Sequence, residues 1–487
     1  MPKLDINSRR LVIFSGALAF VIISKILIFY PSLQTDDIAR LFDDTPYFYF
    51  QQSRFAEAAL SAILAQSGNA MIDIYPGAAV LYFVLLCALV ALVVDRLTPQ
   101  DIHFVMPLLA TGLIVSSPFS TTLLMFRSAI PAQVLGLTGV ILFIRPILYP
   151  TSPARDLIIS AFGVVLALSS YQPYISLLSV VLVFCLASGM SGGTVCGRLG
   201  LREGVMAFLL GAISYGTLMV LVPRLLGTPP AAAMRGGLIG PEELIPRIRM
   251  LIDSLSIPYG ADDPMTRGGY LWCVGLCLLC AALVQAVQIR DQPISVVATR
   301  LLMGTGILLV CSVTAVAPLL LFNTVWIDSR TQFAGAFAVA FAVLYWAAAA
   351  PRPMQMVLAA LLTGITLFGS AASNRMVIDQ ITLNRLDIRT ATEIARRADD
   401  EAGGRHAGQF VLHDPPYSYG IIERSSLRDR NKSALSAPWS APAVFSLATG
   451  KLHAVEISRD DGFCTAWPRW PAKDAVRILG NTAHVCF

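Results

Sequence analysis

The chain is poor in charge. Asp, Glu, Lys and Arg make up 14% of its 487 residues, whereas hydrophobic residues make up 55%. A soluble domain carries about 25% charged residues, so this composition excludes an ordinary soluble protein and indicates a polytopic membrane protein. The net charge of +5 is typical of Lys and Arg on the cytoplasmic side of such a protein, and it does not indicate nucleic-acid binding.

The sequence also lacks the short motifs of several enzyme classes. No run resembles a P-loop, a dinucleotide-binding fingerprint or an HExxH zinc helix. Ionisable residues are almost absent from the middle of the apolar runs, where a transporter would carry them. Lys25 lies near the outer end of the first run, and we expect its ammonium group to snorkel to the membrane interface.

The nine cysteines fall into two groups. Most lie in or beside apolar runs and are expected to pack in the core. Cys273, Cys277 and Cys280 share a helix face, but no His or acid lies near them, so the spacing does not indicate a metal site. Cys464 and Cys486 stand in a polar tail. We predict a disulfide between them, which would imply an oxidising compartment; two free thiols in a core are the alternative.

Apolar runs separated by short polar loops predict about eleven membrane spans. Lys3, Arg9 and Arg10 precede the first run, residues 11–30, which lacks a signal-peptide cleavage site and is expected to be retained. The N-terminus is therefore predicted to be cytoplasmic and the C-terminus to lie outside. The arginines on the predicted inner side are Arg96, Arg145, Arg155, Arg198, Arg202, Arg290, Arg300 and Arg352.

Two outer loops and the tail differ from the spans. Residues 47–65 and 241–255 are amphipathic, as helices lying in the membrane interface are. The tail is polar, with a helical pattern at 386–398 and a strand-like run at 409–413, and it is long enough for a small α+β domain. We therefore expect a transmembrane domain over residues 1–373 and a C-terminal domain over 374–487.

An acidic pair, Asp36 and Asp37, follows directly on the first span. A carboxylate at the interface can take a proton from a hydroxyl, and Arg is suited to holding a phosphate. The alternative is a solvated helix cap. Charged residues gather at the outer ends of the spans, which fits transfer from a lipid phosphate to an alcohol: Asp36, Asp37, Arg40, Arg54, Arg127, Asp262, Asp263, Arg267, Asp328 and Arg330.

Six short runs lie along the first part of the chain: DDIAR (36–40), SRFAE (53–57), MIDIYP (71–76), SPF (117–119), FRS (126–128) and SSYQP (169–173). Taken in order and by their place in the topology, these runs resemble segments of the bacterial serotype-converting, O-antigen-type glucosyltransferases. The likeness reaches to about Arg330 and continues weakly through the last spans. It departs at Arg127, where we would expect an acidic residue before Ser128.

The resemblance implies a GT-C glycosyltransferase fold in the bacterial inner membrane. It implies a polyprenyl-phosphate sugar, often glucose, as donor at the periplasmic face, and a lipid-linked or surface glycan such as O-antigen as acceptor. A donor synthase and a flippase are the expected protein partners, beside membrane lipid; nucleic acid is not. No cofactor is implied with certainty: Asp262 and Asp263 lack a third ligand for a divalent cation.

The resemblance also assigns roles. An acidic residue of the first loop would carry catalysis, and adjacent residues on a helix point about 100° apart. One of Asp36 and Asp37 is therefore the expected base and the other a cap or sugar-orienting group; we prefer Asp36, which leads the motif. The expected donor phosphate or sugar ligands are Arg40, Arg54, Arg127, Tyr171, Gln172, Asp328 and Arg330.

Other interpretations stay open from the sequence. The arginines are also placed to snorkel at the interface, and Tyr171, which lies two residues before Pro173, is also placed as a plain membrane anchor. A GT-C transferase acting on lipid A or protein would use the same donor class. A flippase for lipid-linked glycans, or a scaffold for a polysaccharide complex, would need no catalytic group.

Overall fold

The computed structural model describes residues 6–30, 32–41, 46–98, 102–190, 198–227, 239–254, 269–287, 293–321, 333–348, 350–404, 407–416, 419, 432–459 and 462–487. By their contacts they divide into two compact units, which we treat separately. The membrane unit comprises Met1–Ile26, Thr45–Leu124 and Ala129–Ser373. The tail unit comprises Leu27–Asp44, Met125–Ser128 and Asn374–Phe487.

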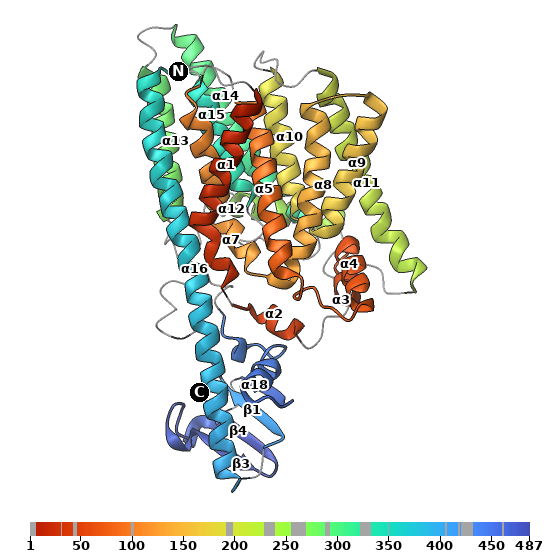
Figure 1. Cartoon of the computed structure of the whole chain (residues 1–487), viewed down its shortest axis with the longest axis vertical. Coiled ribbons are helices and arrows are strands. Elements are labelled where there is room, and N and C mark those ends of the chain that lie inside the picture. The colour runs from red at the N-terminus through yellow and green to blue at the C-terminus, as the bar shows by residue number, and fades with distance from the viewer. Residues whose placement is uncertain are drawn as a thin grey trace. The chain divides into compact units, whose positions relative to one another are not determined.

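The membrane unit is helical. In it α8 packs against α5 and α9, and α9 packs against α11 (Figure 1). Its helices are α1 (Ile6–Lys25), α3 (Pro46–Gln51), α4 (Phe55–Gln66), α5 (Tyr75–Leu97), α6 (Val105–Ser116), α7 (Pro118–Leu124), α8 (Ile130–Leu148), α9 (Pro153–Ser170), α10 (Tyr174–Met190), α11 (Arg198–Leu225), α12 (Leu244–Ser254), α13 (Gly269–Val287), α14 (Ile294–Val316), α15 (Ala334–Ala348) and the first part of α16 (Arg352–Glu401).

Seven helices of the described residues are long and apolar enough to cross a membrane, or eight if the bent pair α6 and α7 is one span. The chain is therefore a polytopic, largely helical membrane protein. Three shorter apolar helices, α10, α13 and α15, fall on further runs that the sequence predicts to span. The count of about eleven spans stays a prediction.

Small residues let the helices of this unit approach closely. Gly139 on α8 faces Gly163 on α9, and a Cβ built on Gly139 would lie 2.6 Å from the Gly163 carbonyl oxygen. Close approach through small residues is a common way for membrane helices to pack. Any larger side chain at either glycine would push α8 and α9 apart.

The expectation that Lys25 snorkels is wrong. Its side chain is 1% exposed, and Nζ donates to the Ser117 carbonyl oxygen at 2.7 Å and to the Ser373 hydroxyl at 3.0 Å. A third hydrogen bond joins it to the Thr121 hydroxyl. The ammonium group thus has an acceptor for each proton, which offsets the cost of burial. Ser117 lies at the 42° break between α6 and α7, so Lys25 holds that break.

Both amphipathic stretches predicted for the outer loops are helical. The first is divided into α3 and α4 by a turn at residues 52–54. The second forms a 3-10 turn, η4 (Pro241–Glu243), and α12. Ile245 and Ile252 of α12 are 68% and 67% exposed, as the apolar face of an interfacial helix would be. Its contact with a membrane interface stays a prediction.

The tail unit is built around a four-stranded sheet with the order β2-β1-β4-β3. Strand β1 is parallel to both neighbours, and β3 is antiparallel to β4. Helix α18 (Ala441–Thr449) connects β1 to β2, and the end of α16 precedes β1 (Figure 1). The strands are β1 (Gln409–His413), β2 (Ala454–Ser458), β3 (Val476–Leu479) and β4 (Thr482–Cys486).

Three sequence predictions in the tail are confirmed. The helical pattern at 386–398 lies in α16, and the strand-like run at 409–413 is β1. Cys464 and Cys486 form a disulfide, which joins the end of β4 to the short η10 turn (Phe463–Ala466).

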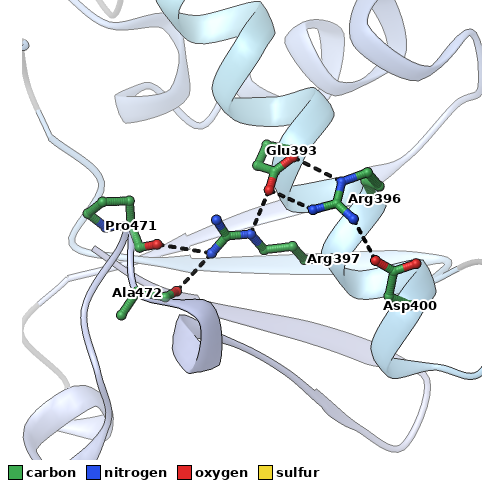
Figure 2. A network of polar contacts seen from close by, with 6 residues as sticks. All are labelled: Glu393, Arg396, Arg397, Asp400, Pro471 and Ala472. Carbon is green, nitrogen blue, oxygen red and sulfur yellow. Dashed lines mark hydrogen bonds and ion pairs between the residues drawn. The ribbon is translucent and has the colours of Figure 1, made fainter.

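A polar network fixes the last turns of α16 to the loop before β3 (Figure 2). Arg397 donates to the carbonyl oxygens of Pro471 and Ala472 at 3.0 and 2.8 Å, and its guanidinium lies 4.6 Å from the centre of the Trp470 ring. Glu393 bonds both Arg397 and Arg396 at 2.8 Å. Arg396 is largely exposed and adds little, whereas the Arg397 contacts tie helix to sheet.

Candidate functional site

The segment with the acidic pair belongs to the tail unit. The Leu33 amide donates to Asn384 Oδ1 at 2.7 Å, and its carbonyl accepts from Asn384 Nδ2 at 2.8 Å. After it, α2 (Thr35–Arg40) buries Ile38 in the core that contains Phe410 and Phe445. A backbone held at both polar groups and a buried apolar side chain fix α2 on α16 and the sheet.

Asp37 is fully buried and accepts four hydrogen bonds. Oδ1 accepts from the Ser128 amide at 2.9 Å and from the Ser128 hydroxyl at 2.7 Å. Oδ2 accepts from the amides of Arg127 and Gln34 at 3.1 and 3.2 Å. Burial raises the pKa of Asp37 above its usual value, and these hydrogen bonds oppose the rise. The carboxylate therefore joins α2 to the segment 125–128, with both oxygens engaged.

Asp36 has a different environment. It is half-buried, and among the described residues no hydrogen bond or ion pair engages its carboxylate. It lies about 100° around the helix from Asp37. The adjacent carboxylates are thus separated by environment: one is enclosed in the fold, and the other reaches water.

Arg127 is occupied by main-chain carbonyls. It is 9% exposed, and Nη2 donates to the Ile28 carbonyl at 3.0 Å, to the Ser32 hydroxyl at 3.3 Å and to the Tyr30 carbonyl. These acceptors follow the C-terminal end of the first helix, where a cation is favourable. The sequence predicted Arg127 as a donor ligand; here its guanidinium holds the chain between the first helix and α2. Arg40 ends α2 and is half-buried.

A second polar cluster lies in the membrane unit. Arg54 Nη1 is 3.3 Å from Glu57 Oε2, and the guanidinium lies 5.0 Å from the centre of the Tyr171 ring. Glu57 is fully buried. The structure thus brings together Arg54 and Tyr171, which the sequence predicted separately. Sequence reasoning missed Glu57, although its i,i+3 spacing from Arg54 was a usable signal.

The turn before Arg54 is clamped by two side chains. Ser53 has a φ of 58°, and its carbonyl accepts from the Tyr215 hydroxyl at 3.0 Å. The Gln52 carbonyl accepts from Gln172 Nε2. Gln172, predicted as a sugar ligand, therefore donates from its amide nitrogen to the main chain. Nothing in the sequence marked Tyr215, which lies in the middle of an apolar helix.

The remaining predicted residues lie outside the described part of the chain: Asp262, Asp263, Arg267, Asp328 and Arg330. Within the described part, no group of three or more His, Cys, Asp or Glu side chains is placed to hold a metal ion. The acidic pair and the Arg54 cluster belong to different units, and each is described by itself.

Comparison with known proteins shows that much of the chain matches one protein family. The family model described as Glucosyl transferase GtrII matches residues 26–348. This range includes α2, the segment 125–128 and all residues of the Arg54 cluster. No curated protein and no solved structure gives a significant match.

Proposed function

The chain belongs to the glucosyl transferase GtrII family, and from this membership we propose that it transfers glucose from a polyprenyl-phosphate donor to a surface glycan such as O-antigen. The proposed site is at the periplasmic face of the bacterial inner membrane. The disulfide in the tail supports this side, because disulfides persist in oxidising compartments.

The contrast between Asp36 and Asp37 carries the proposal. A general base needs a carboxylate within reach of the substrate hydroxyl. Asp37 is enclosed and has both oxygens engaged by Gln34, Arg127 and Ser128, whereas Asp36 is half-buried. Asp36 is therefore the base, and Asp37 is the positioning residue that fixes α2.

The proposed step is a single displacement. Asp36 takes the proton of the acceptor hydroxyl while the hydroxyl oxygen bonds to the anomeric carbon. The bond from that carbon to the phosphate oxygen breaks, and the lipid phosphate leaves with the electron pair. Displacement from the opposite side inverts the anomeric centre, so a β-linked donor gives an α-linked product.

Arg40 and Arg54 are proposed to bind different parts of the donor, the phosphate and the sugar. Arg40 is four residues after Asp36, so both lie on one face of α2, where the cation can stabilise the growing charge of the leaving phosphate. Arg54 is already balanced by Glu57. A balanced Arg–Glu pair suits neutral hydroxyls better than a phosphate, so Arg54 is proposed as a ligand of the sugar.

The test is transfer by the purified protein in liposomes. Polyprenyl-phosphate glucose and a lipid-linked O-antigen acceptor should give a glucosylated glycan, and UDP-glucose should give none. The anomer of the product, read by NMR, should be opposite to that of the donor. Transfer from UDP-glucose, or retention of the anomeric configuration, would contradict the proposed donor or mechanism. Transfer to lipid A or protein instead of glycan would contradict the acceptor.

A further inference from the structure

Ser53 has a strained backbone in a buried turn. Among the described residues only Ser53 and Asp414 combine a side chain with a positive φ, and that of Ser53 is 58°. The left-handed region is unfavourable for a residue with a Cβ, and it persists where the surroundings enforce it. Ser53 is 1% exposed and follows α3 at its C-terminal end, where the Ser53 amide donates to the Phe50 carbonyl at 3.0 Å and the Arg54 amide donates to the Tyr49 carbonyl at 3.1 Å. This is a Schellman cap with Ser53 at its left-handed position, and contacts from other helices add to it.

Two buried side chains hold the two successive peptides of this turn. The Tyr215 hydroxyl, from α11, donates to the Ser53 carbonyl across a sequence separation of 162 residues. Gln172, from the turn between α9 and α10, donates to the Gln52 carbonyl across 120 residues. Tyr215 is 4% and Gln172 9% exposed.

The residue that follows the strained turn is Arg54. Its guanidinium lies over the Tyr171 ring, and its Nη1 faces Glu57. A return of Ser53 to negative φ would redirect the chain at Arg54 and take the guanidinium off the ring. The direction of Arg54 therefore depends on the cap of α3 together with the hydrogen bonds that the Gln52 and Ser53 carbonyls accept.

We propose that Tyr215 and Gln172 are positioning residues, which hold the left-handed turn at Ser53 and thereby aim Arg54 at the sugar of the donor. This inference rests on the proposed function, in which Arg54 binds that sugar. It gives Gln172 an indirect role in place of direct contact with the sugar, and it gives a role to Tyr215, which the sequence did not mark.

The experiment measures donor KM and kcat separately in liposomes. Tyr215→Phe removes the hydroxyl and keeps the ring, and it should raise donor KM by about 2- to 12-fold, the range of one net hydrogen bond, with kcat nearly unchanged. Glycine adopts positive φ without strain, so adding Ser53→Gly to Tyr215→Phe should return KM to within about twofold of Ser53→Gly alone. Gln172→Leu should behave as Tyr215→Phe does.

Tyr174→Phe is the matched control. The Tyr174 hydroxyl also donates to a buried main-chain carbonyl, that of Gln133, at 3.2 Å, but it does not touch the Ser53 turn. Its donor KM should equal that of the wild type. Thermal unfolding of each variant shows whether the fold is kept, and Gln172→Leu carries the test if Tyr215→Phe does not fold.

Three results would overturn the inference. A wild-type donor KM in both Tyr215→Phe and Gln172→Leu would show that the hydrogen bonds from these two side chains to the turn do not affect donor binding. A raised KM that Ser53→Gly fails to lower would show that Tyr215 acts through something other than strain. A wild-type donor KM in Arg54→Ala would remove the proposed role of Arg54 and with it the role of Tyr215 and Gln172. A raised donor KM in Arg54→Ala, with a wild-type KM in Tyr215→Phe and Gln172→Leu, would overturn the role of Tyr215 and Gln172 alone.

Discussion

Replacing Asp37 by Asn should destabilise the tail unit even though the two side chains have nearly the same size. Each Asp37 oxygen accepts two hydrogen bonds in a fully buried site. Asn has one carbonyl oxygen, and its NH₂ group would face two donors, either those of Ser128 or the amides of Gln34 and Arg127. If NH₂ faces Gln34 and Arg127, their two amides lose their acceptor; if it faces Ser128, the hydroxyl can turn to accept from it, but the Ser128 amide and the second N–H of Asn are left without one. In either case two buried donors lack an acceptor.

The size of the effect follows from those two donors. A buried donor without an acceptor costs about 1–3 kcal/mol, so Asp37→Asn should lower the free energy of unfolding of the tail unit by about 2–6 kcal/mol. Asp36→Asn is the matched control, because Asp36 is half-buried and has no partner among the described residues. Its effect should stay within about 0.5 kcal/mol.

Pulse proteolysis over a urea series measures both variants on the purified protein in detergent. The tail fragment of Asp37→Asn should become cleavable at clearly lower urea than the wild-type fragment, and that of Asp36→Asn should not. Equal urea midpoints for Asp36→Asn and Asp37→Asn would refute the assignment of Asp37 as the residue that fixes α2.

Three further outcomes are expected. Because the pKa of Asp37 is raised in the folded protein, the stability that its protonation contributes is fully present below its ordinary pKa and is lost as pH rises through the raised value. The urea midpoint should therefore fall with rising pH in the wild type and fall less in Asp37→Asn; an equal fall in both proteins would contradict this. Opening the Cys464–Cys486 disulfide, which spans 22 residues, should lower the unfolding free energy of the tail by about 3 kcal/mol; a Cys486→Ala variant as stable as the oxidised wild type would be the opposite result. Alkaline phosphatase fused after Phe487 should be active in the periplasm, and an inactive fusion would place Asp36 on the wrong side of the membrane.

Local patterns were enough to predict several elements. An amphipathic period of about 3.6 residues marked α12, and a short apolar run marked β1. The two cysteines outside the apolar runs were the pair that forms the disulfide. Each of these features depends on neighbours in sequence or on composition alone.

Features set by distant contacts could not be predicted. Asp37 meets Ser128, 91 residues away, and Tyr215 meets Ser53, 162 residues away. Lys25 was predicted to snorkel because no acceptor for it is evident nearby in the sequence; its acceptor Ser373 is 348 residues away. The grouping of residues 27–44 and 125–128 with the tail likewise depends on packing. A sequence shows which side chains are polar, but not which distant carbonyl or amide each one meets.

One kinetic comparison tests the role of Asp36 as the base. Asp36→Asn keeps the size of the side chain and loses the proton acceptor, so glucose transfer from polyprenyl-phosphate glucose should fall by about 10²–10⁴-fold. Protein yield, membrane insertion and donor affinity should stay at wild-type values. Wild-type transfer by Asp36→Asn would contradict the role of Asp36 as the base, and the base would then have to be sought among Asp262, Asp263 and Asp328.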